Sequence, residues 1–308
     1  MTSLLTPDAQ LQAALDGLLG RIYARHDLGP EDLAATWLAY DRHLAEGDVA
    51  APARGASHRG GVPIYPASVV KLFYMAAVEQ WLEDGRLQLD ASIERALANM
   101  IGVSSNEGTN YLVDLLTGTT SGPELGEAAF AEWAEKRGTV NRYLRSWRWP
   151  ELKGVNVCQK TMDDDRYGRE RQYAGVEGHN HNRLTTGGTA RLIYEICIGR
   201  LISPARSKRM LDFMARDHRP ETWRNDPLHQ VGGFFGEGLP ADAKLWSKCG
   251  HTSWTGHAPA SWRRHDAAYV ELANGRAFTL VVFTEGRKQA ENAAILPDFA
   301  QEIAALSR

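Results

Sequence analysis

The segment Ser68-Val69-Val70-Lys71 places a hydroxyl and an amine three residues apart at the start of an apolar helical stretch. Residues three apart on a helix lie on the same face, so these two side chains can reach each other. A helix N-terminus has positive potential and free backbone amides, which favour an alkoxide-like nucleophile and an oxyanion. Partial desolvation lowers the pKa of a lysine there, so that it can act as a base. The segment therefore predicts a nucleophile, Ser68, with Lys71 as its base.

Two further segments carry groups that suit the same chemistry. Ser104-Ser105-Asn106 lies between two helical runs and offers a hydroxyl for proton relay and an amide that can position a substrate carbonyl. Lys248-Cys249-Gly250 follows a strand-like run, where a cation beside a glycine can hold an anionic substrate group. His251 and Thr252 come directly after it. These groups could assist a nucleophilic serine.

Each segment also has an ordinary structural interpretation. Ser68 could cap a helix on which Lys71 is merely exposed, and the residues at 104–106 could cap the next helix. The segment at Lys248 could be a strand end that turns into a loop at its glycine. The order and spacing of the three segments, taken together, favour the catalytic interpretation.

The composition restricts the possible partners. Of the 308 residues, 43% are hydrophobic and 24% are charged, which excludes wholesale disorder. The net charge is −3, whereas a protein that binds nucleic acid or anionic membranes normally has a basic excess. Cys158, Cys197 and Cys249 match no zinc or redox motif and indicate free thiols in a reducing compartment. We therefore expect no nucleic acid and no membrane as partner.

The N-terminal residues predict a location. Residues 1–8 lack the basic and apolar regions of a secretory signal. No stretch reaches the roughly 18–20 apolar residues that a membrane-spanning helix needs. The prediction is a cytoplasmic protein, or a secreted or periplasmic one if a leader was removed, and the oligomeric state stays open.

The apolar pattern predicts strands towards both ends of the chain and helices between them. A turn at Asn274-Gly275 joins the last two predicted strands as a hairpin. Helices are predicted over residues 11–25, 68–87, 93–101, 108–116, 124–136, 189–198, 203–215 and 289–306, and strands over 34–40, 244–247, 267–271 and 278–284. The simplest α+β architecture is an antiparallel sheet built from both termini, flanked by helices, with an all-helical domain inserted.

The polar segment 147–184 has little periodicity, which is typical of a functional or disordered loop. It contains Asp163-Asp164-Asp165 together with His179 and His181, which suggests a cation site. The spacing matches no known set of metal ligands, and the solvation of a polar loop explains these residues better. We expect no metal ion and no cofactor.

The three segments, in this order, resemble the class A serine β-lactamases and the wider penicillin-recognising serine hydrolases, whose signature is Ser-x-x-Lys, Ser-Asp-Asn and Lys-Thr-Gly. Asn110, which follows Asn106 by four residues, and the stretches 182–192, 201–214 and 238–250 agree, and the similarity runs over about 33–306. The resemblance implies a β-lactamase/transpeptidase-like fold, an α/β sandwich. Its sheet domain would consist of residues 1–65 and 216–308 and its all-helical domain of residues 66–215, with the active site in the cleft between them.

The resemblance also implies catalytic roles. Ser68 would be the acylated nucleophile and Lys71 the base that helps to deprotonate it. Ser104, working with Lys248, would pass a proton to the leaving nitrogen or oxygen.

Substrate-binding roles follow in the same way. Asn106 would position the acyl side chain of the substrate. The backbone amides of Ser68 and His251 would form the oxyanion hole, in which each donor is typically worth about 3–4 kcal/mol in the transition state. Gly250 and Thr252, on either side of His251, would also contact the substrate.

The sequence departs from the family pattern at several positions. Ser105 stands where the family has Asp, and Cys249 stands where it has Thr or Ser. A thiol is a poor hydrogen-bond donor, so recognition of a penicillin carboxylate should weaken. With Pro-Glu-Leu kept in register, Trp149 falls at the position of the family's deacylating Glu. Glu151 is the carboxylate nearby; it would need a rebuilt loop to act as the base, and it could equally be an exposed loop residue.

These observations predict a serine hydrolase that forms an acyl-enzyme on Ser68 and hydrolyses a β-lactam or a related amide or ester. The alternative is a penicillin-binding-like protein or an esterase-like relative that is acylated and deacylates β-lactams poorly, because the deacylating Glu is missing. A catalytically inactive binding module on the same fold is the third possibility.

Overall fold

A computed structural model describes residues 3–48 and 53–307. Its centre is a seven-stranded sheet with the strand order β1-β3-β2-β7-β6-β5-β4. All neighbouring strands are antiparallel except β1 and β3, which are parallel. The strands are β1 (Leu5–Pro7), β2 (Leu33–Tyr40), β3 (Ala53–His58), β4 (Ala215–Arg216), β5 (Lys244–Thr252), β6 (Arg263–Glu271) and β7 (Ala277–Glu285).

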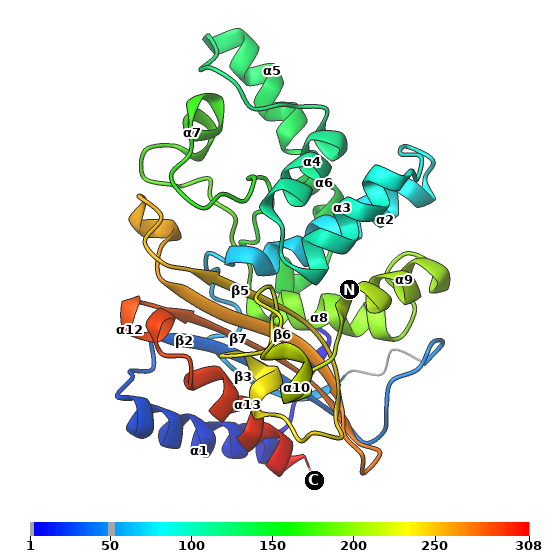
Figure 1. The fold of residues 1–308 in the computed structure, drawn as a ribbon, viewed down its shortest axis with the longest axis vertical. Coiled ribbons are helices and arrows are strands. Elements are labelled where there is room, and N and C mark those ends of the chain that lie inside the picture. The colour runs from blue at the N-terminus through cyan, green and yellow to red at the C-terminus, as the bar shows by residue number, and fades with distance from the viewer. Residues whose placement is uncertain (1–2, 49–52, 308) are drawn as a thin grey trace.

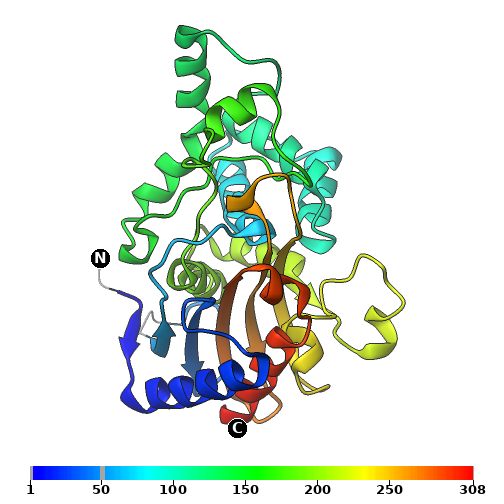
Figure 2. The same ribbon diagram turned by 90° about the vertical axis from the view of Figure 1, so that its left-hand side faces the viewer.

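Helices cover both faces of the sheet (Figures 1 and 2). On one face, α1 (Ala9–His26) and α13 (Ile295–Leu306) pack against each other and bury their apolar stripes in a core shared with alternate strand residues. On the other face, α8 (Thr186–Cys197) lies across β2, β6 and β7, with α9 (Pro204–Met214) beside it. Because successive strand residues point to opposite faces, the sheet contributes to two separate cores.

The remaining long helices form a helical portion beyond one end of the sheet (Figure 1). Nearly every side chain of its central helix, α2, is buried, as its almost uniformly apolar sequence requires. The helical portion contains α2 (Lys71–Glu83), α3 (Ala91–Gly102), α4 (Asn106–Thr117), α5 (Glu127–Arg137), α6 (Thr139–Ser146) and α7 (Gly168–Ala174). Shorter elements are the 3₁₀ turns η1 (Ala67–Val70), η2 (Pro150–Leu152) and η3 (Ala258–Ala260) and the helices α10 (Pro220–Trp223), α11 (Phe235–Gly238) and α12 (Arg287–Glu291).

The predicted α+β fold with a helix-flanked sheet is confirmed. The division into 1–65 with 216–308 and 66–215 stays a proposal, and residues 1–2, 49–52 and 308 lie outside the described part of the chain. In the described part of the chain, α8 lies within 66–215, the stretch predicted as an all-helical domain, and yet it packs on the sheet.

Individual elements differ from the prediction in instructive ways. The predicted helix 68–87 is the turn η1 followed by α2, and the predicted helix 289–306 is interrupted between α12 and α13. Strands β1, β3 and β4 were not predicted, because they are short or contain few apolar residues. Strand β5 continues beyond residue 247 to Thr252, so Lys248 and the four residues after it lie within the strand.

Buried ion pairs order much of the long polar segment 147–184. Arg137 of α5 bonds Glu170 of α7 at 2.6 Å, and Lys160 bonds Asp114 of α4 at 2.8 Å. The amide oxygen of Asn182 accepts hydrogen bonds from the backbone of residues 158 and 159, both at 2.9 Å. These contacts fix the chain just before residue 161, where it reaches the functional pocket.

A buried histidine ties the sheet to the segment before η1. Nε2 of His265 on β6 lies 2.9 Å from the backbone oxygen of Tyr65, and Nδ1 accepts a hydrogen bond of 3.0 Å from the backbone amide of Thr284. Because Nδ1 is an acceptor, the proton is on Nε2 and the ring is neutral. Burial lowers the pKa of His265 to about 3.

Lowering the pH should therefore destabilise the fold through His265. Its pKa is about 3 when folded and about 6.5 when unfolded, so the unfolded chain binds a proton first as the pH falls below 6.5. Between pH 7 and pH 5 this linkage should remove about 2 kcal/mol from the free energy of unfolding. Urea denaturation at both pH values measures the loss, and His265→Asn should show a smaller one. His181, whose pKa is also lowered to about 3, contributes the same loss to both proteins. An equal loss in the variant would therefore mean that His265 contributes nothing, which would contradict the assignment.

Candidate active site

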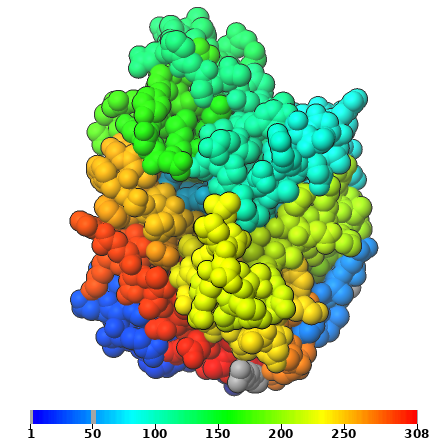
Figure 3. Space-filling model, in the orientation of Figure 1, coloured from blue at the N-terminus to red at the C-terminus, as the bar shows by residue number. Residues whose placement is uncertain are grey.

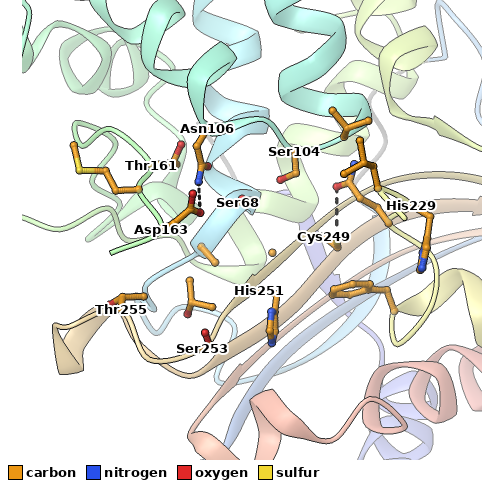
Figure 4. A pocket seen from close by; sticks show the side chains of 18 of the residues that line it. Ser68, Ser104, Asn106, Thr161, Asp163, His229, Cys249, His251, Ser253 and Thr255 are labelled. Atoms are coloured by element: carbon orange, nitrogen blue, oxygen red, sulfur yellow. Dashed lines mark hydrogen bonds between the residues drawn. The ribbon is translucent and has the colours of Figure 1, made fainter. Parts of the chain in front are cut away.

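A pocket of about 470 Å³ lies where the helical portion meets the edge of the sheet. Its walls come from η1, the start of α4, the segment around residue 162, the loop before α11 and the far half of β5. Figure 3 shows the hollow on the surface, and Figure 4 shows side chains from these separate elements pointing into it. Ser68, Ser104, Asn106, Gly250, His251 and Thr252 all line it, so the structure brings together six of the predicted site residues.

Close contact between β5 and η1 positions Ser68. A Cβ atom at Gly250 would lie 2.9 Å from the backbone nitrogen of Ser68 and 2.9 Å from the backbone oxygen of Pro66. Only glycine allows the strand to approach the turn this closely. Since β4 pairs with only two residues of β5, the strand edge beyond Trp246 has no strand beside it and faces η1.

Two buried lysines converge on the hydroxyl of Ser104. Nζ of Lys71 lies 3.2 Å from Ser104 Oγ, and Nζ of Lys248 lies 2.9 Å from the same atom. Lys71 also donates to the backbone oxygen of Ser104 and, at 2.9 Å, to Oδ1 of Asn106. Ser104 has a left-handed backbone conformation with φ of 61°, which is strained for a residue other than glycine.

Burial shifts the titration of both lysines. It lowers the pKa of Lys71 well below its usual value, and the charge of Lys248 lowers it further. Burial also lowers the pKa of Lys248 to about 8. Desolvation penalises a charged amine, and two amines beside one hydroxyl repel each other when both are protonated. A neutral amine that can accept a proton is thus accessible near physiological pH.

The wall opposite β5 is the segment 161–163, which α4 holds in place. Asn110 donates to the backbone oxygen of Thr161 and accepts from its backbone nitrogen, both at 3.0 Å. Nδ2 of Asn106 donates to Oδ1 of Asp163 at 2.7 Å. Among the lining residues in the described part of the chain, Asp163 is the only Asp or Glu.

The structure places Glu151 elsewhere. Its Oε1 accepts hydrogen bonds from the backbone nitrogen of Leu4 at 2.6 Å and from Ser3, and its Oε2 pairs with Arg191 at 2.8 Å. Trp149 stacks on Trp147 and under the Arg191 guanidinium. Neither Glu151 nor Trp149 lines the pocket. The polar loop instead reaches the pocket at residues 161–163, and a deacylating role for Glu151 stays a prediction.

The structure shows the local contacts of the other residues that depart from the expected pattern or were expected to bind substrate. Ser105 caps α4, with its hydroxyl accepting from the backbone of Gly108 at 3.0 Å. Burial raises the pKa of the Cys249 thiol to about 11, and its sulfur lies 3.4 Å from Oε1 of Gln230. Thr252 donates to a backbone oxygen beside η3, whereas His251 is exposed at the pocket.

Gln230 is a site residue that the sequence analysis missed. Its Oε1 accepts from Nζ of Lys248, and its Nε2 donates to the backbone oxygens of Ile101 at 2.7 Å and Gly102 at 2.6 Å. This side chain joins the lysine on the sheet to the end of α3, just before Ser104. The loop around Gln230 has neither periodicity nor a recognised motif, so nothing in the sequence singled it out.

Comparisons with known proteins identify the family. A family model described as the Beta-lactamase enzyme family matches residues 91–306, which is more than half of the chain. The chain belongs to this family. No curated protein matches the sequence.

Solved structures agree with the fold of this β-lactamase-family chain. A β-lactamase from Sphaerobacter thermophilus is 17% identical, with a TM-score of 0.65 over 95% of this chain and 97% of the other. A β-lactamase from Chitinophaga pinensis is 15% identical, with a TM-score of 0.63 over 96% and 100%. A point mutant of PBP-A, solved as an acyl-enzyme complex with penicillin-G, is 16% identical, with a TM-score of 0.62 over 99% and 98%. At these identities the likeness shows the fold alone.

The described residues include no helix long and apolar enough to cross a membrane. They also include no group of three or more His, Cys, Asp or Glu side chains arranged to hold a metal ion. His181, from the segment that had suggested a cation site, instead lies 2.9 Å from a nitrogen of His257.

The seam between β5 and η1 can be tested with an added methyl group. Gly250→Ala should push η1 away from the strand and reduce the rate at which Ser68 is acylated by at least about tenfold, since small misplacements of reacting groups are costly. Acylation by a fluorescent penicillin measures the rate. Gly61→Ala is the matched control, because nothing lies within 4 Å of its Cβ position. Equal rates in both variants would contradict the positioning role.

Proposed function

We propose that this protein is a serine hydrolase of the class A β-lactamase type, in which Ser68 forms an acyl-enzyme with a β-lactam or a related amide or ester. The observation that carries the proposal is the pair of buried lysines, Lys71 and Lys248, bonded to the Ser104 hydroxyl in the pocket that Ser68 lines. An ordinary helix cap would not require two buried amines at one hydroxyl.

The proposed acylation needs only groups that line the pocket and the two buried lysines behind its wall. Neutral Lys71 takes the proton of Ser68 as the serine oxygen bonds to the substrate carbonyl carbon. The bond from that carbon to the leaving nitrogen or oxygen then breaks. Ser104 gives its proton to the leaving atom and recovers one from Lys71 or Lys248, which it contacts. The backbone amides of Ser68 and His251 would stabilise the oxyanion.

The fold supports the proposed substrate class. Two of the neighbours described above are β-lactamases, and the PBP-A mutant was captured with penicillin-G. The partner is then a small molecule, and the cytoplasmic location stays a prediction.

The pocket wall favours a second candidate, a penicillin-binding-like protein whose acyl-enzyme is long-lived. Glu151 is committed to Arg191 and to the N-terminal strand, so it would have to break both contacts to act as a deacylating base. Thr161, which lines the pocket, provides a hydroxyl and no carboxylate. Acylation would proceed in such a site, whereas activation of water for deacylation would be weak.

Substitution of the nucleophile tests acylation directly. Incubation with penicillin-G should add one covalent adduct to the intact protein, visible by mass spectrometry and mapped to Ser68 by peptide digestion. Ser68→Ala should abolish the adduct because no other hydroxyl sits before Lys71 on η1. Ser253→Ala is the control, since it removes an exposed hydroxyl from the same pocket. An adduct that persists in Ser68→Ala, or an unaltered protein that neither holds an adduct nor hydrolyses penicillin-G, would refute the proposal.

A carboxylate at position 161, in addition to that of Asp163, should speed deacylation. In Thr161→Glu the adduct should disappear roughly 100-fold faster, the usual range for a positioned general base. Thr161→Gln has the same side-chain length without the charge and should leave the rate unchanged. The decay of the adduct is followed by mass spectrometry after excess penicillin-G is removed. If the unaltered protein already loses its adduct within seconds, the hydrolase is correct and the long-lived acyl-enzyme is wrong.

A further inference from the structure

Asp163 is held at the pocket in a specific orientation. Its Oδ1 accepts a hydrogen bond of 2.7 Å from Nδ2 of Asn106, whose Oδ1 in turn accepts from buried Lys71 at 2.9 Å. The other oxygen of Asp163, Oδ2, accepts no hydrogen bond from the described part of the chain, and the residue is exposed. Figure 4 shows Asp163 and Asn106 joined at one side of the pocket, close to Ser68.

The two aspartates that follow are committed to other contacts. Asp164 accepts a hydrogen bond of 2.7 Å from the hydroxyl of Tyr167, and Asp165 accepts one of 2.8 Å from the backbone of Arg166. Neither lines the pocket. The acidic run therefore presents a single carboxylate to the substrate, and Asp164 provides a matched control.

The charges around the pocket differ between its solvent side, where Asp163 lies, and its deeper part. Lys71 and Lys248 are fully buried behind the wall, where they are shared among serine, asparagine, glutamine and backbone oxygens. At the solvent side, Asp163 supplies the only acidic side chain of the lining. A substrate group that lies beside Asn106 therefore meets a negative charge, although the deeper part of the pocket is positive.

We propose that Asp163 is a specificity-determining residue that selects substrates with an ammonium group on the carbon next to the acyl-side carbonyl. This inference rests on the proposed function, in which Asn106 positions the acyl side chain. One hydrogen of Asn106 Nδ2 is taken by Asp163, and the second is left for the carbonyl of the side chain. A substituent on the next carbon then lies beside the open oxygen of Asp163. An ammonium group gains a charge-assisted hydrogen bond there, and a carboxylate is repelled.

Three penicillins that differ only at that carbon test the proposal. Penicillin-G carries hydrogen there, ampicillin an ammonium group and carbenicillin a carboxylate. The second-order rate constant for acylation of Ser68 should decrease in the order ampicillin, penicillin-G, carbenicillin. Each step should be roughly fivefold at low salt, the upper range for a partly exposed ion pair, and should shrink as salt is added.

Asp163→Asn removes the charge and keeps an oxygen that can accept from Asn106, so it should bring the three rate constants within about twofold of one another. Asp164→Asn should leave the order unchanged. Retention of the order in Asp163→Asn, or no order in the unaltered protein, overturns the inference.

Two other outcomes also decide the matter. If Asp163→Asn slows loss of the adduct equally for all three penicillins and leaves their acylation rates unaffected, Asp163 acts on water and does not select substrates. If none of the three acylates Ser68, the proposed function fails, and the inference falls with it. A charge-dependent order that Asp163→Asn abolishes is the result that supports it.

Discussion

Two ammonium groups that meet at one hydroxyl are the constraint on which the rest of this structure depends. Removing a charged amine from water is costly, and both Lys71 and Lys248 are fully buried, with no ion pair to a carboxylate among the described residues. Their protons are accepted instead by neutral oxygens, among them Ser104, Asn106 and Gln230. Such an arrangement lowers the pKa of both lysines, which is how a base becomes available at neutral pH.

The fold can be understood as the means of holding these amines together. Lys71 comes from the most buried helix, and Lys248 comes from a strand whose next glycine touches η1. Asp266, buried on β6 opposite Cys249, accepts from the backbone of Phe235 at 2.9 Å and so fixes the loop that carries Gln230. Burial raises the pKa of Asp266 to about 6. The loop that carries Gln230, which accepts a hydrogen bond from Lys248, is thus held in place by β6.

Site residues in short sequence motifs could be predicted, whereas site residues that are positioned by contacts with distant parts of the chain could not. The spacing of Ser68 and Lys71 follows from helix geometry, and the order of the three motifs resembles a known family, so the six lining residues could be identified in advance. Thr161 and Asp163 could not, because the segment that carries them has no periodicity and is ordered by ion pairs such as Arg137 with Glu170. Nor could the sequence show that Glu151, the carboxylate considered as a base, pairs with Arg191 on α8.

The departures from the family pattern do not fall on the groups proposed to form the acyl-enzyme. The groups that would form the acyl-enzyme are all present and converge, down to the glycine that lets β5 approach Ser68. Ser105 stands where the family has a carboxylate, and its hydroxyl caps the N-terminus of α4. Cys249, which departs from the pattern, and Thr161, which provides no carboxylate, both line the pocket and would affect substrate recognition and the water that follows. In the proposed mechanism, such a site is still acylated, and the residues on the rim determine which acyl group is accepted and how long it stays.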